Sequence, residues 1–173
     1  MVDSQVEKRS PLHRLIISLL SLLIATILLL GINIVSPGGM TMFAGKRPTN
    51  LGVNDGKLAP CPNSPNCVSS QSADTEHKIE PLTYNTSAAE AIADLKKVIQ
   101  SQERATIISE SPNYIYAEFK SKLMGFVDDV EFYLDEAAKV IQVRSASRLG
   151  QSDLGVNRKR IETIRAAFDT LKS

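Results

Sequence analysis

The stretch from Tyr114 to Ser147, YIYAEFKSKLMGFVDDVEFYLDEAAKVIQVRSAS, decides the fold class of this chain. It contains three runs rich in β-branched and aromatic residues, at Tyr114–Ser121, Phe126–Leu134 and Lys139–Ser147. Gly125 opens the second run, and Asp135–Ala138 supplies a turn before the third. Consecutive strands joined by such short turns form an antiparallel meander.

Further elements extend this meander in both directions. Upstream lie a strand over Ala105–Glu110, a helix that begins at the capping box of Ser87 and Glu90 and runs to about Gln102, and a short edge strand over Glu76–Tyr84. Downstream, apolar residues at helical spacing predict a last helix over Leu154–Leu171. We therefore predict an α+β domain of order β-α-β-β-β-β-α, with an antiparallel sheet covered by two helices.

A long apolar segment precedes this domain. Leu15–Val35 contains no charged residue, and as a helix it would span about 31 Å, which matches the hydrocarbon core of a bilayer. Basic residues lie just before it, at Lys8, Arg9 and Arg14, and none follows until Lys46. The positive-inside rule therefore places the N-terminus in the cytoplasm and the domain outside. A cleaved signal peptide, with Ala44 at the cleavage site, is the competing interpretation.

These segments divide the chain into four parts. We expect a cytoplasmic tail over residues 1–14 and a single transmembrane helix over residues 15–35. An irregular linker, punctuated by Gly, Pro and Asn and partly docked on the domain, follows over residues 36–60. The globular extracytoplasmic domain then occupies residues 61–173.

The two cysteines of the chain enclose a short loop. Cys61 and Cys67 flank the pentapeptide PNSPN, whose prolines and asparagines favour turns that bring the two ends together. An extracytoplasmic location permits disulfides, so we expect a structural disulfide that stabilises the fold by about 2 kcal/mol. The alternatives are a redox pair, which is more often spaced Cys-x-x-Cys, and a metal site that includes His77.

The charges are unevenly distributed along the domain. The formal net charge is +1, which gives no electrostatic argument for nucleic acid as a partner. Seven acidic residues lie between Glu110 and Glu136, and seven basic residues lie between Arg144 and the C-terminal end. We expect these two stretches to pair with each other, and a basic patch kept for an outside partner is the alternative.

The turn at Asp135–Ala138 predicts a register for the last hairpin. The apolar pairs in this register are Phe132–Ile141 and Val130–Val143. On the other face Asp129 lies opposite Arg144, and the two would form an ion pair worth about 0.2 to 1 kcal/mol if exposed. A one-residue slip would turn the side chains of one strand to the opposite face.

The same register places Asp128 on the apolar face, opposite Ser145. A carboxylate there must find a partner or become protonated. The start of the last helix offers Asn157, in line with the apolar residues of that helix, and Arg158 beside it. We predict one ligand-binding cluster at the end of the sheet, formed by Asp128, Ser145, Ser147, Asn157 and Arg158. A cluster that only pins the helix to the sheet is the alternative.

Several separated blocks of sequence carry a resemblance to a known family. They are GKRP (45–48), LGV (51–53), LAPCPNSPNCVSSQ (58–71), GFVDDVEF (125–132), RSASRLG (144–150) and SDLGVNRKRIE (152–162). Together they resemble the domain-of-unknown-function 1499 family, in the form typical of cyanobacteria and plastids, over roughly residues 45–172. The resemblance implies no established reaction, cofactor or catalytic residue. It suggests a photosynthetic host, so the domain would face the periplasm or the thylakoid lumen.

The sequence assigns no catalytic residue. His77 is the only histidine beyond the predicted anchor, and no nucleophile-elbow motif, phosphate-binding glycine loop or metal-ligand cluster occurs. We therefore expect no metal and no cofactor. The predicted function is a non-enzymatic binding or interaction module for a small molecule, a lipid or a membrane-protein partner. The alternative is an enzyme whose site combines Asp128, Ser145, Ser147 and Arg148.

Overall fold

The computed structural model describes residues 11–35 and 43–171, except for the side chains of residues 14 and 28–35. The chain divides into two units, Met1–Thr41 and Met42–Ser173. In the first, α1 runs over Pro11–Val35. Among the described residues, no helix meets the combined demands of length and apolarity for crossing a membrane. The anchor over Leu15–Val35 therefore stays a prediction.

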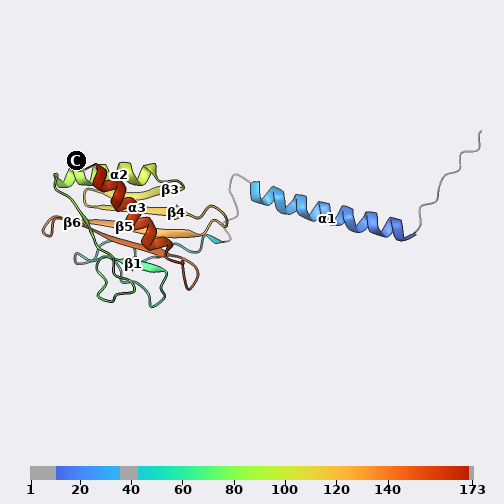
Figure 1. Ribbon diagram of the computed structural model, residues 1–173, viewed down its shortest axis with the longest axis horizontal. Helices are drawn as coiled ribbons and strands as arrows, with labels where there is room; N and C mark the ends of the chain where they lie inside the picture. Colours follow the sequence, from blue (N-terminus) through green and yellow to red (C-terminus); the bar gives the residue numbers. More distant parts are fainter. Residues whose placement is uncertain (1–10, 36–42, 172–173) are drawn as a thin grey trace, which may run out of the picture. The chain divides into compact units, whose positions relative to one another are not determined.

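The second unit contains a six-stranded antiparallel sheet (Figure 1). Its strands are β1 (Cys67–Ser69), β2 (Leu82–Thr83), β3 (Ala105–Ser111), β4 (Tyr114–Lys120), β5 (Val127–Asp135) and β6 (Val140–Ser147). They lie in the order β1-β6-β5-β4-β3, and β2 also pairs with β6. The α+β domain with an antiparallel sheet is confirmed, and so are the four long strands, to within one residue at each end.

The edge of the sheet next to β6 differs from the prediction. Only Leu82–Thr83 of the expected strand Glu76–Tyr84 pairs with β6, and β1 was not predicted at all. Proline has no N–H to donate to a strand ladder, so Pro81 limits pairing upstream of β2. The two short strands lie at opposite ends of β6, against Ala146 and Ile141 respectively.

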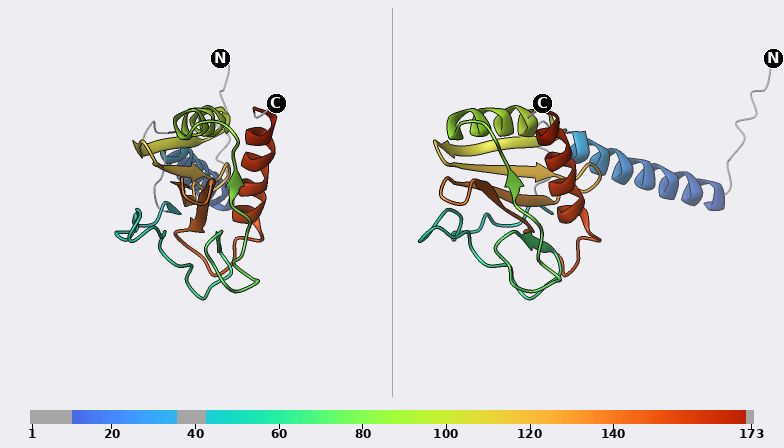
Figure 2. Two further views of the ribbon diagram at one scale, coloured as in Figure 1. Left: turned by 90° about the vertical axis from the view of Figure 1, so that its left-hand side faces the viewer. Right: turned by 60° about the vertical axis from the view of Figure 1, so that its left-hand side comes forward.

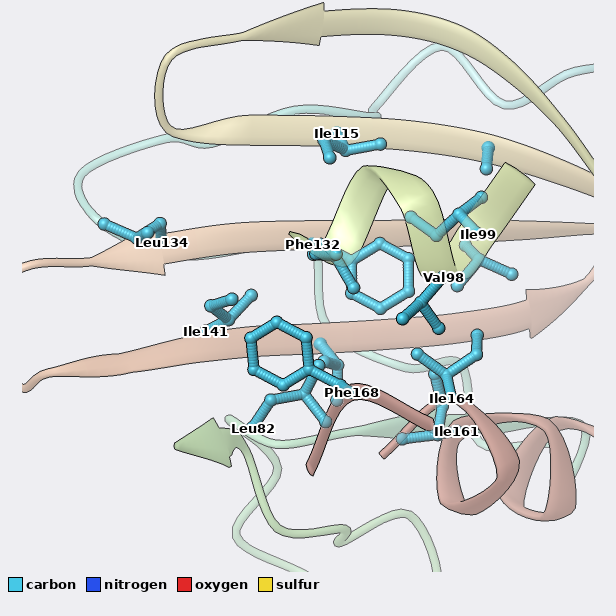
Figure 3. Close-up of a cluster of buried hydrophobic side chains, with 14 of the residues drawn as sticks. Leu82, Val98, Ile99, Ile115, Phe132, Leu134, Ile141, Ile161, Ile164 and Phe168 are labelled. Atoms are coloured by element: carbon cyan, nitrogen blue, oxygen red, sulfur yellow. The ribbon is translucent and has the colours of Figure 1, made fainter. Parts of the chain in front are cut away.

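Two helices cover one face of the sheet (Figure 2). α2 runs over Ala88–Ser101, and its N-cap Ser87 accepts a hydrogen bond from the backbone of Glu90, as the capping box predicts. α3 runs over Val156–Thr170, slightly shorter than predicted. Phe132 of β5 and Phe168 of α3 are almost fully buried between the layers, where Figure 3 shows them among the isoleucines and valines of the core.

Residues 43–60 cover part of the opposite face, and we call this segment the strap (Figure 2). The Arg47 guanidinium donates to Glu118 of β4, and the Gly52 backbone N–H donates to Glu131 of β5. Leu58 is 5% exposed, and its backbone N–H donates to Gln71. The compact unit includes the whole strap, which is the 43–60 part of the predicted linker.

The predicted register of the last hairpin is wrong by two residues. Phe132 lies opposite Val143, and Asp129 lies opposite Ala146. The turn occupies residues 136–139, one position later than predicted, because Asp135 ends β5 and its carboxylate accepts a hydrogen bond from the Ala138 backbone. Lys139 takes the left-handed conformation, with φ 55°, that closes the turn. A two-residue shift leaves each side chain on its predicted face.

The pairing of the outer strand β3 with β4 is interrupted at one point. Its register with β4 shifts between Ile107 and Ser109. Ile108 therefore lies in a bulge, where 36% of it is exposed. Such bulges bend an edge strand and interrupt its ladder of hydrogen bonds.

The disulfide between Cys61 and Cys67 is confirmed, and their Cα atoms lie 5.7 Å apart. We expect the paired replacement Cys61→Ser and Cys67→Ser to lower the free energy of unfolding of the domain by about 2 kcal/mol, because the unfolded loop gains conformational freedom. Urea unfolding of the full chain in mild detergent, followed by circular dichroism, measures this loss. Dithiothreitol should destabilise the unchanged protein equally and leave the variant unaffected. An unchanged midpoint in the variant would contradict the prediction.

Candidate functional site

The two adjacent aspartates of β5 face opposite sides of the sheet. Asp128 shares its face with Val130 and Phe132 under the helices, while Asp129 lies on the strap side, and both are buried. Each side of the sheet therefore holds its own cluster of polar residues. The helix-side cluster consists of Asp128, Ser145, Ser147, Asn157 and Arg160. The strap-side network consists of Arg47, Tyr114, Tyr116, Glu118, Asp129, Glu131, Arg144 and Arg148.

Asn157 is the centre of the helix-side cluster and is fully buried. Its amide oxygen accepts a hydrogen bond from the Ser145 hydroxyl at 2.6 Å. Its amide nitrogen donates to the Ser147 hydroxyl at 2.9 Å and to the backbone carbonyl of Asn66 at 3.0 Å. One side chain thus joins α3, β6 and the loop that the disulfide closes.

The loop before α3 fixes the position of Asn157. Gly155 precedes the helix in the left-handed conformation, with φ 80°. The carboxylate of Asp153 accepts hydrogen bonds from the Gly155 and Asn157 backbone N–H groups, at 3.0 and 2.7 Å. A carboxylate at this position satisfies N–H groups that have no partner within the helix. The first turn of α3 is therefore held with Asn157 directed toward the sheet.

Arg160 supplies the cation of the cluster. Its guanidinium donates to the Asp128 carboxylate and to the Ser145 hydroxyl, and it lies 4.9 Å from the centre of the Phe119 ring. Asp128 itself lies directly opposite Ser147 in the sheet. The charge of Asp128 is thus neutralised within the cluster.

Four of the five predicted residues come together, and Arg158 does not. Arg158 instead donates to the backbone carbonyls of Lys78 and Glu76, at 2.7 and 2.8 Å. Residues three apart on a helix are neighbours on its surface, whereas adjacent residues diverge by about 100°. The spacing between Asn157 and Arg160 was therefore the signal that could have identified the correct arginine.

The strap-side network is organised around Arg148. Its guanidinium donates to Asp129 at 2.9 and 2.6 Å, and also to Glu118. The Tyr116 hydroxyl joins the same two carboxylates, at 2.6 Å from Asp129 and 3.1 Å from Glu118. Arg47 of the strap completes the group by donating to Glu118 at 2.8 and 2.6 Å.

A second part of this network surrounds Glu131, which is fully buried. Its carboxylate accepts hydrogen bonds from the Tyr114 hydroxyl at 2.8 Å, from the Gly52 backbone at 2.7 Å and from Arg144 at 3.3 Å. The predicted ion pair of Asp129 with Arg144 is therefore wrong. Because the register differs by two residues, Arg144 forms an ion pair with Glu131, and Asp129 forms one with Arg148. The broader prediction that the acidic and basic stretches pair with each other is confirmed.

The contacts within the network shift the pKa values of Glu118 and Tyr116 away from neutrality. Burial alone would raise the pKa of the Glu118 carboxyl, but hydrogen bonds from Arg148 and Arg47 outweigh it and hold that pKa below the usual value. Burial, followed by the hydrogen bond to Asp129, raises the pKa of Tyr116 well above its ordinary value. A general acid or base works best with a pKa near the operating pH, and neither shift brings its group there.

Neither cluster, both formed by described residues, has the form of a metal centre. Among the described residues, no group of three or more His, Cys, Asp and Glu side chains is placed to hold a metal ion. A depression of about 750 Å³ lies on the strap, lined by residues 50–55 and 57–60. None of the five predicted site residues lines it. His77, the candidate ligand beside the cysteines, instead contacts the Asp74 carboxylate at 2.7 Å.

Two loops at one end of the sheet carry exposed apolar side chains. Residues 121–126 join β4 to β5, and residues 148–155 join β6 to α3, at the end where the Phe43 and Phe126 rings lie 5.3 Å apart (Figure 1). We call this the Phe43 end of the sheet. Five residues, in these loops and at the start of α3, form the loop-tip group: Leu123 (92% exposed), Met124 (44%), Leu149 (41%), Leu154 (94%) and Val156 (49%). Their positions in irregular loops follow no periodic pattern, so nothing in the sequence groups these five residues together.

Comparison with known proteins bears on this architecture. No curated protein matches the chain. The sequence profile of the family described as "Protein of unknown function (DUF1499)" matches residues 57–168, which include the helix-side cluster and the loop-tip group. The match covers well over half of the chain. The chain therefore belongs to the DUF1499 family.

Proposed function

We propose that this chain is a single-pass membrane protein whose extracytoplasmic domain is a non-enzymatic binding module for a small molecule, a lipid or a membrane-protein partner. One contrast carries the proposal. Within each of the two clusters the polar side chains bond chiefly to other members of the same cluster. The loop-tip group, in contrast, presents apolar surface to solvent. Exposed apolar side chains gathered in one region mark interaction surfaces more often than isolated ones do.

The character of α1 supports the membrane part of the proposal. Between residues 15 and 27, α1 consists of Leu, Ile, Ala, Ser and Thr, with Leu and Ile on every side of the helix. A helix that is apolar all round, rather than along one stripe, fits the interior of a bilayer. Lys8, Arg9 and Arg14 precede it, which favours a cytoplasmic N-terminus. The disulfide agrees with an oxidising compartment for the domain, and a periplasm or a thylakoid lumen in a cyanobacterial or plastid setting would provide one.

No observation favours the alternative of an enzyme with an Asp/Ser/Arg site. Arg148 lies on the strap side of the sheet, away from the other three residues of that site. Ser145 and Ser147 bond to Asn157 rather than to a base such as histidine. A nucleophilic serine needs an adjacent general base.

Reporter fusions to the full chain test the topology. We expect alkaline phosphatase at the C-terminal end to be active, because it folds outside the cytoplasm. Green fluorescent protein at the same position should be dark, because green fluorescent protein folds poorly after export. The matched control places each reporter at the N-terminal end, where the pattern should reverse. A fluorescent C-terminal fusion would contradict the proposed orientation.

Native mass spectrometry tests the binding function. The full chain, extracted from its own membrane in mild detergent, should retain a bound lipid, small molecule or partner protein. The double variant Leu123→Ser and Leu154→Ser should lose it, because the loop-tip group supplies the apolar contact area. Retention of the same mass by this variant would place the binding surface elsewhere on the chain.

A further inference from the structure

The geometry of the Phe43 end points to a specific partner: we propose that the loop-tip group binds the surface of the lipid bilayer itself. This inference rests on the proposed anchor and names the partner of the proposed binding module. Leu123, Met124 and Leu154 would enter the boundary between head groups and acyl chains. The domain would then be held at the membrane by a second contact besides α1.

The distribution of exposed apolar residues is the first argument. In the described part of the domain, eight large apolar side chains are exposed, and five of them form the loop-tip group. The other three, Val53, Ile108 and Leu171, are between 36% and 44% exposed. The most exposed pair, Leu123 and Leu154, lie in separate loops of the same end. Single exposed apolar residues are ordinary, but a set of loop tips that share one end of a sheet can enter an apolar phase together.

The backbone of Leu154 is the second argument. Its φ of 54° lies in the left-handed region, which is unfavourable for a residue with a bulky side chain. The same residue is 94% exposed. The fold thus holds a leucine in a disfavoured conformation and leaves its side chain in water. Such strain persists where the surrounding structure imposes it, and it is commonest at functional positions.

The path of the chain is the third argument. Gly45 lies against Arg148 and Leu149, so the strap begins beside the 148–155 loop. The predicted anchor ends at Val35, and the eight steps from there to Phe43 reach at most about 28 Å. The long strands measure about 30 Å, so the opposite end of the sheet lies about that far from the Phe43 end. The tether therefore attaches at the end that carries the loop-tip group.

Charge is the fourth argument. Lys122 adjoins Leu123, and Lys46 follows the aromatic contact at Phe43; both lysines are exposed. Lysine side chains beside an apolar loop can place their ammonium groups among lipid phosphates while their stems lie along apolar surface. The combination of apolar tips and flanking lysines matches the chemistry of a bilayer interface better than that of a protein interface core, where lysine is depleted.

Tryptophan fluorescence tests this inference cleanly, because the chain contains no tryptophan. Leu123→Trp and Leu154→Trp each introduce a single reporter, and Ala137→Trp, in the exposed β5–β6 turn at the opposite end, is the matched control. Full-length variants are reconstituted in vesicles of phosphatidylcholine and phosphatidylglycerol. We expect blue-shifted emission at positions 123 and 154 that brominated acyl chains quench, and solvent-like emission without quenching at position 137.

The outcomes separate this inference from the proposed function. Alkaline carbonate should fail to extract each variant if α1 is an anchor. Carbonate-resistant protein with solvent-like emission at positions 123 and 154 would overturn the inference and leave the anchor standing. Extraction by carbonate would overturn the anchor and the inference together. A blue shift that brominated lipid does not quench would also overturn the inference, because it would indicate a protein partner or a second copy of the chain.

Discussion

Replacing Arg148 with methionine should lower the free energy of unfolding of the domain by about 3 to 5 kcal/mol. The Arg148 side chain is 6% exposed, and its guanidinium is shared by Asp129, whose side chain is 1% exposed, and by Glu118. Methionine fills much of the same volume, so the main loss is electrostatic. Two buried carboxylates are left at the site of one removed cation, and Arg47 reaches only Glu118. Urea unfolding of the full chain in mild detergent, followed by circular dichroism, measures the change.

The matched control is Arg104→Met. This guanidinium pairs with Glu103 at the surface, where the two side chains are 43% and 83% exposed. Exposed ion pairs of this kind contribute less than about 1 kcal/mol. If Arg148→Met costs no more than Arg104→Met, the strap-side network does not stabilise the fold.

The pH dependence gives the same prediction a second readout. In the unchanged protein the pKa of Glu118 lies below 4.5, so its contribution to stability is present above pH 4.5 and is lost as the pH falls through the folded-state pKa. Removal of Arg148 raises that pKa. The folded variant then binds a proton more readily than the unchanged protein does, and its penalty should shrink as the pH falls toward and below 4.5. A penalty independent of pH would mean that packing, not charge, causes the loss.

Replacing Asn157 with alanine should cost about 2 to 4 kcal/mol, through lost hydrogen bonds and a small cavity. The amide is fully buried and bonds to Ser145, Ser147 and the carbonyl of Asn66. Without it, the Ser147 hydroxyl loses its donor, and α3 loses its link to the disulfide loop. Thermal and urea unfolding of the full chain, compared with Asn85→Ala in an exposed loop, would show the difference.

The same variant distinguishes a structural cluster from a ligand site. A cluster that pins α3 to the sheet predicts a lower unfolding midpoint and an unchanged set of bound molecules in the native mass spectrum. A ligand site predicts the reverse, with the bound mass lost and the midpoint of the ligand-free domain preserved. The dense mutual bonding of Asp128, Ser145, Asn157 and Arg160 leads us to expect the first result.

Sequence patterns predicted which face each β5 and β6 residue would occupy, but not its partner. Alternation has a period of two, so a shift of two residues preserves every face. The choice between the two registers depended on the turn. There the Asp135 carboxylate accepts a hydrogen bond from the Ala138 N–H, and Lys139 adopts a positive φ. Both residues were visible in the sequence, yet neither is as strong a turn signal as glycine or an Asn-Gly pair.

Sequence patterns could not predict the strap-side network, for a different reason. Tyr116, Glu118, Asp129 and Glu131 alternate with apolar residues, as they would on a strand face open to water. They are buried because residues 43–60, irregular and distant along the chain, lie over part of that face. An irregular segment has no periodicity from which its docking position could be inferred. β1 was missed similarly, since three residues are too few to establish a strand pattern.

The interrupted ladder of β3 makes this domain a poor template for self-association. A regular outer strand offers a row of unpaired N–H and carbonyl groups to any second chain, and this is how edge-to-edge aggregates begin. The bulge at Ile108 breaks that row on one side of the sheet. On the other side, two strands of three and two residues cover β6 and expose too little backbone to continue it. Copies of the protein crowded side by side would therefore meet through side chains, and concentrated samples should stay free of cross-β fibrils.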